Sequence, residues 1–339
     1  MKALFLVKPG ETEIREINIP VVGAEEALLR VSMVGFCGGD LNGFRGLFEL
    51  QEYPNVLGHE VGATIEQLGS NVPENLKPGM KVTLNPYSNC GVCFSCRRGR
   101  PNACQDNKTM GVRRPGAMTR YIIVPWTTLF TSEKLSHKDL ALVEPLSVGF
   151  HAVARGRVTG KDRVAVIGCG IVGMGAVAAS AHRGAEVIAI DIDDSKMKTA
   201  RKAGAAHTIN TAKTDLHKAL AEITDGDGPD VIIEAVGNQF TYKAAVDEVA
   251  YTGRVVYIGY AKKPVEYNTG LFVKKEIEIL GSRNSFGEFP EVISYLESGK
   301  FPVDDVISKT VSIEDAGKAL SDWSENPGPV TKIMVNFDI

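Results

Sequence analysis

Four cysteines crowd into fifteen residues of the chain with the spacing C-x2-C-x2-C-x7-C, and they are Cys90, Cys93, Cys96 and Cys104. Thiolates on one compact loop can close a tetrahedron around Zn²⁺, which gives a structural site with no open position for chemistry. The alternative is four free or disulfide-bonded cysteines, which so regular a spacing disfavours in a large intracellular protein. We therefore predict a structural zinc site that holds this loop together.

A second set of metal-binding residue types is spread along the chain. Cys37 lies in GFCGGD, His59 and Glu60 lie in LGHE, and Glu144 lies in LVEPLSVGFHA. Taken singly, a histidine in a β-rich region is usually structural and an internal glutamate is usually solvated. Together they offer sulfur, nitrogen and oxygen ligands, the mixture that suits a catalytic Zn²⁺ with an exchangeable position.

A G-x-G-x-x-G motif at Gly168, Gly170 and Gly173 follows a predicted strand and opens a predicted helix. In that context Gly168 permits a tight turn, Gly170 lets the backbone approach a pyrophosphate, and Gly173 allows close packing of helix and strand. The helix amino terminus then offers free N–H groups to the phosphates. Asp191 ends the next strand, where a carboxylate accepts bonds from ribose hydroxyls and repels a 2′-phosphate, so we expect NAD rather than NADP. The alternative is that Asp191 only caps the helix near Ser195.

The elements that must position these groups fall into two regions. Residues 1–150 contain alternating runs at 27–38, 56–69 and 81–86 broken by frequent turn signals, which predicts a β-rich region. Beyond about residue 160, buried strands alternate with helices, which is typical of a parallel sheet covered on both faces. The expected strands are 163–168, 186–191, 207–210, 229–237, 253–259 and 276–282, and the expected helices are 171–184, 195–204, 214–224 and 240–250.

The last segment predicts helix 289–300, strand 306–312, helix 313–325 and strand 331–337. We expect this tail to return to the first region, so that a nucleotide domain is inserted into a catalytic domain. The predicted division is 1–150 for the catalytic domain, with the zinc lobe at about 88–106, then 151–285 for the NAD domain and 286–339 for the return.

Length and composition limit the class of protein. The chain has 339 residues, 44% hydrophobic and 23% charged, with a net charge of −3, which is typical of a globular protein with two domains. No basic run predicts nucleic-acid binding, and no apolar run reaches the roughly 18 residues that cross a bilayer. The first ten residues predict a strand rather than a secretion signal. We therefore expect a cytoplasmic enzyme that acts on a small molecule, without nucleic-acid or membrane partners.

On these motifs the whole chain resembles the zinc-containing medium-chain dehydrogenase/reductase superfamily. The GHE motif, the four-cysteine lobe, EPLSVGFHA and GCGIVG are similar to the polyol, sorbitol, threonine and sugar-acid dehydrogenase branch. The resemblance implies an α/β fold in which a Rossmann doubly wound parallel sheet is inserted into a β-rich GroES-like catalytic domain. It also implies NAD, two zinc ions per chain and a homotetramer or homodimer. Further cofactor contacts are expected at Ile171, Val172, Ile192, Ala235, Val236, Ile258 and Arg283, whereas Cys169 is expected to be a buried filler.

The same resemblance assigns roles at the catalytic zinc. Cys37 and His59 are expected to ligate the metal directly. Glu60 either ligates or exchanges with water, and Glu144 either ligates or holds the bound water. Asp40 is expected to orient His59. The zinc lowers the pKa of a secondary hydroxyl of the substrate, and the alkoxide then transfers hydride to the nicotinamide to leave a ketone.

The chain departs from the family at two positions. Relatives usually carry Ser or Thr two residues after the ligand cysteine and His three residues further on, whereas this chain has Gly39 and Asn42. Glycine cannot relay a proton through a side chain, so either a water chain replaces the hydroxyl or the protein is a specialised catalyst. Gly39 also enlarges the space for a bulky substrate, and Asn42, Arg45 and Arg113 are candidate substrate ligands, although each arginine is as readily a surface charge.

Three functions remain open from sequence. The first is a zinc- and NAD-dependent polyol, sugar or sugar-acid dehydrogenase. The second is a zinc-free quinone or enoyl reductase of the same fold, which the two cysteine-containing motifs disfavour. The third is a catalytically retired NAD-binding protein, which Gly39 alone favours.

Overall fold

The computed structural model describes residues 1–339, which divide into two compact units. The first unit contains 1–144, 289–298 and 307–339, and the second contains 145–288 and 299–306. Residues 299–306, which the sequence analysis placed in the returning tail, therefore pack with the second unit. None of the helices combines the length and hydropathy needed to cross a lipid bilayer.

The first unit is built on a seven-stranded sheet with the order β10-β6-β5-β3-β18-β17, where β9 also pairs with β3. Two small sheets, β2-β1-β4 and β7-β8, complete it. Only the β17–β18 pair is parallel within these sheets. The strands are β1 (Lys2–Lys8), β2 (Glu11–Glu16), β3 (Glu26–Gly35), β4 (Asn55–Val56), β5 (Glu60–Leu68), β6 (Lys81–Leu84), β7 (Tyr87–Ser88), β8 (Lys108–Thr109), β9 (Tyr121–Pro125), β10 (Leu129–Thr131), β17 (Lys309–Val311) and β18 (Ile333–Asn336).

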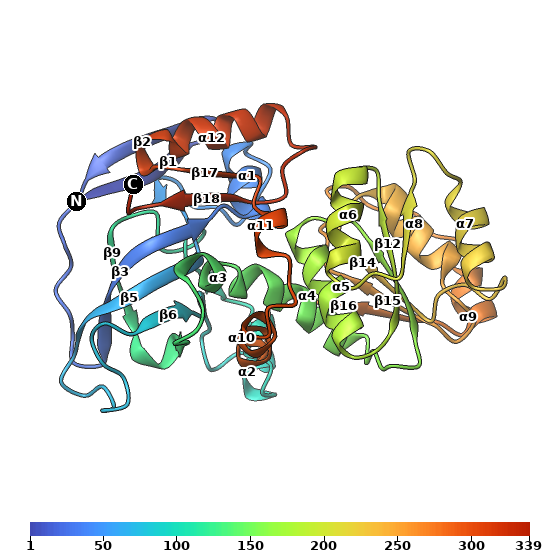
Figure 1. Ribbon diagram of the computed structural model, residues 1–339, viewed down its shortest axis with the longest axis horizontal. Coiled ribbons are helices and arrows are strands. Elements are labelled where there is room, and N and C mark those ends of the chain that lie inside the picture. Colours follow the sequence, from blue (N-terminus) through green and yellow to red (C-terminus); the bar gives the residue numbers. More distant parts are fainter. The chain divides into compact units, whose positions relative to one another are not determined.

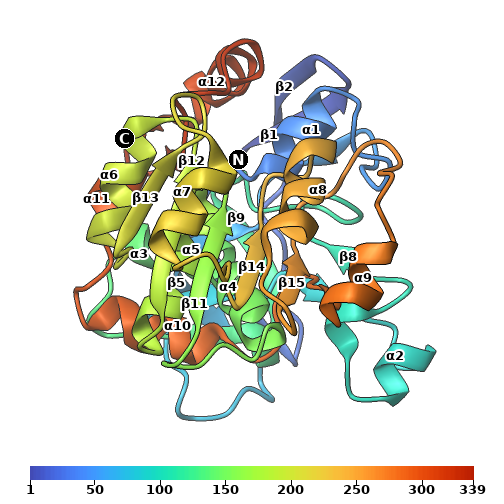
Figure 2. The ribbon, with the colours of Figure 1, turned by 90° about the vertical axis from the view of Figure 1, so that its right-hand side faces the viewer.

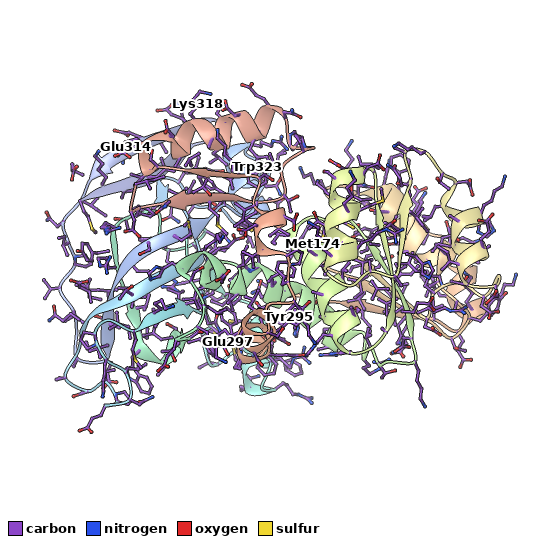
Figure 3. All side chains as sticks on the ribbon, viewed as in Figure 1. Met174, Tyr295, Glu297, Glu314, Lys318 and Trp323 are labelled. Atoms are coloured by element: carbon purple, nitrogen blue, oxygen red, sulfur yellow. The ribbon has the colours of Figure 1, made fainter.

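Helices in the first unit are mostly short. The longest lies near the carboxyl end of the chain and packs against strands β1, β17 and β18 through its buried face. Figure 3 shows Lys318 on its outer side and Trp323 on the side toward the sheet, where Trp323 is buried in the core. The helices are α1 (Gly38–Phe44), α2 (Phe94–Arg97), α3 (His137–Ala141), α10 (Phe289–Glu297) and α12 (Ile313–Glu325), with 3₁₀ turns at Pro101–Ala103 and Trp126–Thr128.

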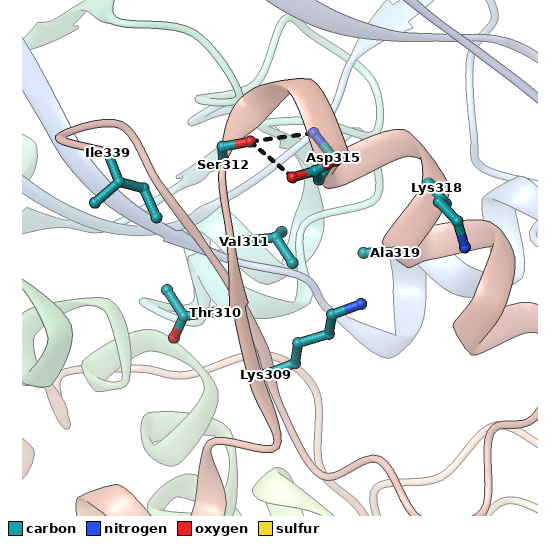
Figure 4. Close-up of a pocket in the computed structure, with 8 residues that line it drawn as sticks. All are labelled: Lys309, Thr310, Val311, Ser312, Asp315, Lys318, Ala319 and Ile339. Atoms are coloured by element: carbon teal, nitrogen blue, oxygen red, sulfur yellow. Dashed lines mark hydrogen bonds between the residues drawn. The ribbon is translucent and has the colours of Figure 1, made fainter.

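The sequence explains where α12 begins. Ser312 is its N-cap, and its hydroxyl accepts a hydrogen bond from the backbone N–H of Asp315, which satisfies one of the unpaired donors of the first turn. Figure 4 shows this cap beside a surface hollow that lies between β17 and α12. Lys309 and Lys318 also line the hollow. None of the predicted site residues lines it, so it is not the candidate site.

The second unit is a six-stranded parallel sheet in the order β13-β12-β11-β14-β15-β16. In Figure 1, α5 and α6 lie on one face of the sheet and α7 and α8 lie on the other, and Figure 2 shows the same strands with helices in front of them. The strands are β11 (Arg163–Ile167), β12 (Glu186–Asp191), β13 (His207–Asn210), β14 (Val231–Glu234), β15 (Arg254–Tyr257) and β16 (Glu278–Gly281). The helices are α5 (Ile171–His182), α6 (Asp194–Lys202), α7 (Leu216–Ile223), α8 (Gln239–Glu248), α9 (Gly270–Lys275) and α11 (Val303–Val306).

Burial explains this regular α/β pattern. All four residues of β14 are buried, as are four of the five residues of β11, because helices cover both faces of the sheet. Helix α5 is buried along most of its length, which its uniformly apolar sequence predicts. A further helix, α4 (Val143–Arg155), was not predicted, because Pro145 and Gly149 are typical helix breakers. Pro145 lies in the first turn, where the missing N–H has no helical partner to lose.

Candidate functional site

The four-cysteine lobe brings its thiols together in the first unit. The Sγ atoms of Cys93 and Cys96 are 3.4 Å apart, those of Cys93 and Cys104 are 3.8 Å apart, and those of Cys90 and Cys104 are 3.6 Å apart. These separations are too long for disulfide bonds, and all six cysteines of the chain are free. They match the edge of about 3.8 Å that a tetrahedron of sulfurs around zinc would have.

Electrostatics in the lobe disfavour ionising all four thiols together. Hydrogen bonds from Ser95 and from the backbone lower the pKa of Cys93 to about 5. Desolvation and the neighbouring thiols raise the pKa of Cys96 to about 12. One thiolate therefore forms readily while another resists a further negative charge, and a divalent cation at the centre would remove that conflict.

The second set of predicted ligands also converges. Ligand atoms of Cys37, His59 and Glu60 all lie within 4.8 Å of one another. His59 and Glu60 are buried and Cys37 is half-buried. Cys37 caps helix α1, and its Sγ accepts a hydrogen bond from the N–H of Gly39 at 3.3 Å. The cap at the start of α1 thus orients the thiol of Cys37. The start of β5 at Glu60 orients the carboxylate of that residue.

Strand pairing positions Glu60 and gives it a partner. Glu60 begins β5 opposite Gly35 on β3, and Gly35 pairs on its other side with Met334 of β18. A Cβ at Gly35 would lie 2.0 Å from the carboxylate oxygen of Glu60, so only glycine leaves room for that side chain. The pairing of β18 brings Lys332 to the same place. Its Nζ lies 2.6 Å from both oxygens of Glu60 and donates to the carbonyl of Phe36 at 2.8 Å.

Glu144 lies in the first turn of α4 and accepts a hydrogen bond from the hydroxyl of Tyr87, which begins β7. Burial raises the pKa of Glu144, opposed by the charge of His59, and the charge of Glu60 raises it further. Burial and the charge of Glu144 raise the pKa of Tyr87 well above its usual range, so its hydroxyl keeps the proton that it donates. Glu144 therefore lies within electrostatic range of the Cys37 cluster, held by a neutral donor.

Asp40 completes the cap of α1, since its Oδ2 accepts from the backbone N–H of Cys37 at 2.8 Å. Its charge also acts on His59, and its expected role in orienting that ring stays a prediction. Its Oδ1 and the Nδ1 of His59 are both buried without a hydrogen-bond partner. Burial lowers the pKa of His59, but the charges of Cys37, Asp40 and Glu144 outweigh it and raise the pKa well above the ordinary value.

Residue 39 is a glycine, so it places no side chain in the space beside Cys37. A Cβ placed on Gly39 would lie 3.7 Å from Sγ of Cys37 and 3.8 Å from the ring of Phe48, which are ordinary contact distances. Phe48 therefore borders this space, a residue that the sequence analysis did not single out. Asn42 lies on α1, where its carbonyl accepts from the N–H of Leu47.

Two candidate substrate ligands are engaged elsewhere. The guanidinium of Arg45 donates to the hydroxyl and the carbonyl of Ser324, which ties α1 to α12. Arg113 forms ion pairs with Asp106 at 3.0 Å and Glu52 at 3.5 Å. The roles of Arg45 and Arg113 as substrate ligands stay predictions.

The predicted cofactor residues gather at the carboxyl edge of the second unit's sheet. Gly168 has φ of +96°, a conformation that favours glycine, and a Cβ on Gly173 would lie 1.7 Å from the carbonyl oxygen of Gly168. Around Gly170 the space is open. Because the strands are parallel, the segments after β11, β12, β14 and β15 meet at this edge. They carry Gly168, Ile192, Ala235, Val236 and Ile258. Asp191 ends β12, Ile171 and Val172 open α5, and Arg283 follows β16.

Asp191 binds the glycine-rich turn rather than capping a helix. Its Oδ2 accepts from the N–H of Cys169 at 2.7 Å, and its Oδ1 accepts from the N–H of Ile192 at 2.7 Å. The N-cap of α6 is instead Asp193, whose side chain accepts from Ser195. The alternative interpretation of Asp191 as a helix cap is therefore wrong. Cys169 is fully buried, as expected of a filler.

Comparison with known proteins identifies the class that this fold and site define. Residues 23–134 match the family model of the alcohol dehydrogenase GroES-like domain, and residues 172–298 match that of the zinc-binding dehydrogenases. L-galactonate-5-dehydrogenase of Escherichia coli is 31% identical over 90% of this chain and 89% of its own. Other relatives are named sorbitol dehydrogenase and D-arabitol-phosphate dehydrogenase. The chain belongs to the zinc-containing medium-chain dehydrogenase/reductase superfamily, and the predicted fold class is confirmed.

Two solved structures carry a cofactor. One, described as a short chain alcohol dehydrogenase of Escherichia coli CFT073 in complex with NADH, is 29% identical with a TM-score of 0.91 and covers 99% of each chain. The other, a zinc-binding dehydrogenase of Sinorhizobium meliloti bound to NADP, is 28% identical with a TM-score of 0.92 and covers 99% of this chain and 98% of its own. The chain is therefore assigned to the zinc-type oxidoreductases that use a nicotinamide cofactor.

Proposed function

We propose that this protein is a zinc-dependent, NAD-linked dehydrogenase that reversibly oxidises a secondary hydroxyl of a polyol, sugar or sugar acid to a ketone. The observation that carries the proposal is the convergence of Cys37, His59 and Glu60 within 4.8 Å. Three positions far apart in sequence thus supply the sulfur, nitrogen and oxygen ligands that suit a catalytic zinc.

The charges of the cluster fit a bound cation. Asp40, Glu60 and Glu144 are buried acidic groups, and Cys37 adds a thiol. The buried ammonium of Lys332 pairs with Glu60. Burying several acidic side chains beside a single ammonium group costs free energy, unless further positive charge is present. A divalent metal held by Cys37 and His59, with Glu60 or Glu144, would provide it.

When bound there, zinc supplies a Lewis acid that lowers the pKa of a coordinated hydroxyl. The chain's own residues set the surroundings. Lys332 fixes the direction of Glu60, Tyr87 fixes that of Glu144, and Gly39 with Phe48 borders open space beside Cys37. We infer that a zinc ion held by the four cysteines stabilises the lobe without contacting substrate. Together with the ion at Cys37, this makes two zinc ions per chain.

For the cofactor, we infer that the Gly168–Gly173 turn receives the pyrophosphate and that Asp191 faces the adenosine ribose. A nicotinamide held by these residues would supply the hydride acceptor. A carboxylate at this strand end repels a 2′-phosphate and so favours NAD. One solved relative with this fold binds NADP, so the fold alone does not select NAD. We therefore attribute the preference for NAD to Asp191.

The substrate class follows from the relatives, whose names include sugar-acid, polyol and polyol-phosphate dehydrogenases. We also infer a cytoplasmic homotetramer or homodimer. A second function, an NAD-binding protein without turnover, is favoured only by the missing hydroxyl at Gly39. A zinc-free reductase of the same fold would not need the Cys37 and four-cysteine sets.

The test is a substrate panel of hexitols, aldonic acids and sugar phosphates, offered with NAD and with NADP to protein of known zinc content. The proposal expects zinc-containing protein to reduce NAD with at least one panel member and to reduce NADP more slowly. A protein that carries both zinc ions and binds NAD, but reduces it with no member of the panel, would favour the second function.

A further inference from the structure

Glu234 is a buried glutamate at the carboxyl end of β14, the strand that lies between β11 and β15 in the parallel sheet (Figure 2). Its side chain is fully buried, and one of its carboxyl oxygens, Oε1, accepts three hydrogen bonds. The donors are the N–H of Val236 at 2.9 Å, the N–H of Gly237 at 2.8 Å and the hydroxyl of Thr241 at 2.8 Å. The side chain of Glu234 therefore sets the path of the turn that follows its own strand.

The other carboxyl oxygen of Glu234 faces the turn after β15. This oxygen, Oε2, is buried without a hydrogen-bond partner, and a Cβ on Gly259 would lie 2.8 Å from it. Glycine at position 259 thus leaves room for the carboxyl group. The backbone carbonyl of Glu234 accepts from the N–H of Ile258 at 2.9 Å and from that of Gly259 at 3.2 Å. Glu234 therefore contacts the turns after two neighbouring strands.

The turn that Glu234 holds packs against the glycine-rich turn. The N–H of Ala235 donates to the carbonyl of Ile167, the last residue of β11, at 2.9 Å. A Cβ on Gly168 would lie 2.6 Å from a methyl carbon of Val236, so Val236 covers the first glycine of the motif. Val236 is also 48% exposed, which leaves part of its side chain open to a ligand at this edge of the sheet. Glu234 thus fixes the backbone of a residue that borders the predicted pyrophosphate site.

We propose that Glu234 is a positioning residue for the nicotinamide cofactor: its carboxyl group holds the turn 235–237 in the conformation in which Val236 packs on the glycine-rich turn and contacts the cofactor. This inference rests on the proposed function, since it requires the cofactor at the carboxyl edge of the sheet. Glu234 is fully buried and acts through Val236. A turn that is ordered before the cofactor arrives loses less conformational entropy on binding, so the cofactor binds more tightly.

The direct test compares Glu234→Met with Glu234→Gln in titrations of NADH fluorescence. Methionine fills a similar volume but offers the three donors no oxygen, whereas glutamine keeps an oxygen acceptor. Burial raises the pKa of Glu234, so an uncharged amide is a close substitute. If the turn of Glu234→Met adopts its binding conformation about a tenth of the time, the Kd for NADH rises about tenfold. Glu234→Gln should bind NADH nearly as tightly as the wild type. Equal Kd values for Glu234→Met and wild type would overturn the inference.

Asp230 provides a matched control at the opposite end of the same strand. It directly precedes β14, and its Oδ2 accepts from the backbone N–H of Arg163 at 2.7 Å. Asp230→Ala should lower the unfolding midpoint and leave the Kd for NADH unchanged, because the amino edge of a parallel sheet lies away from the glycine-rich turn. A rise in Kd as large as that of Glu234→Met would show that any lost carboxylate bond on β14 weakens binding, which would overturn the assigned role.

Val236→Ala shows whether the effect passes through the turn. Val236 is half-exposed, so this variant should fold, and it keeps the proposal testable if Glu234→Met does not. NADH should bind more weakly to Val236→Ala than to the wild type. Adding Glu234→Met should then raise the Kd by a smaller factor than it does in the wild-type background. Wild-type affinity in Val236→Ala, or an undiminished effect of Glu234→Met in that background, would overturn the inference.

Gly170→Val separates this inference from the proposed function. A Cβ on Gly170 meets nothing within 4 Å, so the variant should fold, but its side chain would occupy the space through which the backbone approaches the pyrophosphate. If Gly170→Val binds NADH as tightly as the wild type, the cofactor does not bind at this edge and the proposed function itself is wrong. If Gly170→Val weakens NADH binding and Glu234→Met does not, only the role of Glu234 is overturned.

Discussion

Lys332 and Glu60 form a buried ion pair, with the ammonium nitrogen 2.6 Å from both carboxylate oxygens. Lys332 is 1% exposed and Glu60 is fully buried. Burying such a pair costs free energy because two charges are removed from water. The added hydrogen bond from Lys332 to the carbonyl of Phe36 offsets part of that cost. The pair joins the residue before β18 to the residue beside His59, so the candidate site depends on residues that are 272 positions apart.

Lys332→Met should lower the free energy of unfolding by about 3–5 kcal/mol, because it leaves the charge of Glu60 buried without a partner. Urea denaturation measures this. The double variant Lys332→Met with Glu60→Gln should recover part of the loss. Lys2→Met, which breaks a solvent-screened surface pair with Glu314, should lower the free energy of unfolding far less. Equal midpoints for Lys332→Met and Lys2→Met would contradict the account of the pair.

Gly35→Ala should displace Glu60, since the added Cβ would lie 2.0 Å from its carboxylate oxygen. We expect a stability loss of at least about 1–3 kcal/mol, the range for an overpacked core, together with weaker zinc retention. Gly281→Ala in β16 is the control, because a Cβ there meets nothing within 4 Å. A Gly35→Ala protein that unfolds and retains zinc like the control would show that Glu60 does not need this space.

Gly39→Ser should leave turnover unchanged or improve it. The structure has room for the side chain, with its nearest neighbours 3.7 and 3.8 Å from the added Cβ, and the new hydroxyl offers a proton relay. Steady-state rates on the best panel substrate, with zinc content measured in parallel, give the answer. Complete loss of turnover at normal zinc content would instead show that glycine is needed to make room for the substrate.

Asp191→Ser should raise the ratio of NADP to NAD efficiency by about tenfold or more, equivalent to about 1.4 kcal/mol, because the repelling charge is removed. The measurement is kcat/KM with each cofactor. Asp193→Ser is the control, since Asp193 caps α6 and serine is also a good N-cap. An unchanged ratio in Asp191→Ser would mean that the residue serves only to hold the turn at Cys169.

Local sequence patterns singled out the residues of both candidate metal clusters, because each residue lies in a short motif. Cys37, His59 and the four lobe cysteines stand out by residue type and spacing. The parallel sheet was equally accessible, since buried strands alternate with helices over the second half of the chain. What local patterns could not supply was the partner of Glu60. Lys332 lies 272 residues away, and only the pairing of β18 with β3 brings it there.

Other features were missed for physical reasons that single positions show. Tyr87 follows Asn85 and Pro86 and belongs to no motif, so the sequence analysis did not single it out as a donor to Glu144. Asp40 was expected to orient His59, and its hydrogen bond with the N–H of Cys37 at the start of α1 was missed. Arg45 was predicted as a substrate ligand. In the fold, α12 packs beside α1, and the side chain of Arg45 donates to the hydroxyl of Ser324. For Tyr87 and Arg45 a tertiary contact decided the partner, whereas the bond of Asp40 is a local helix cap.

The most direct test of the central claim, a catalytic zinc at Cys37 that is distinct from the structural one, compares zinc content and NADH formation in Cys37→Ser, Cys104→Ser and wild-type protein. We predict that Cys37→Ser loses one of two zinc ions and all NADH formation, and keeps its unfolding midpoint near that of wild type. Cys104→Ser should lose the other zinc and unfold more readily. A Cys37→Ser protein that retains both zinc ions, or still forms NADH at the wild-type rate, would contradict the account.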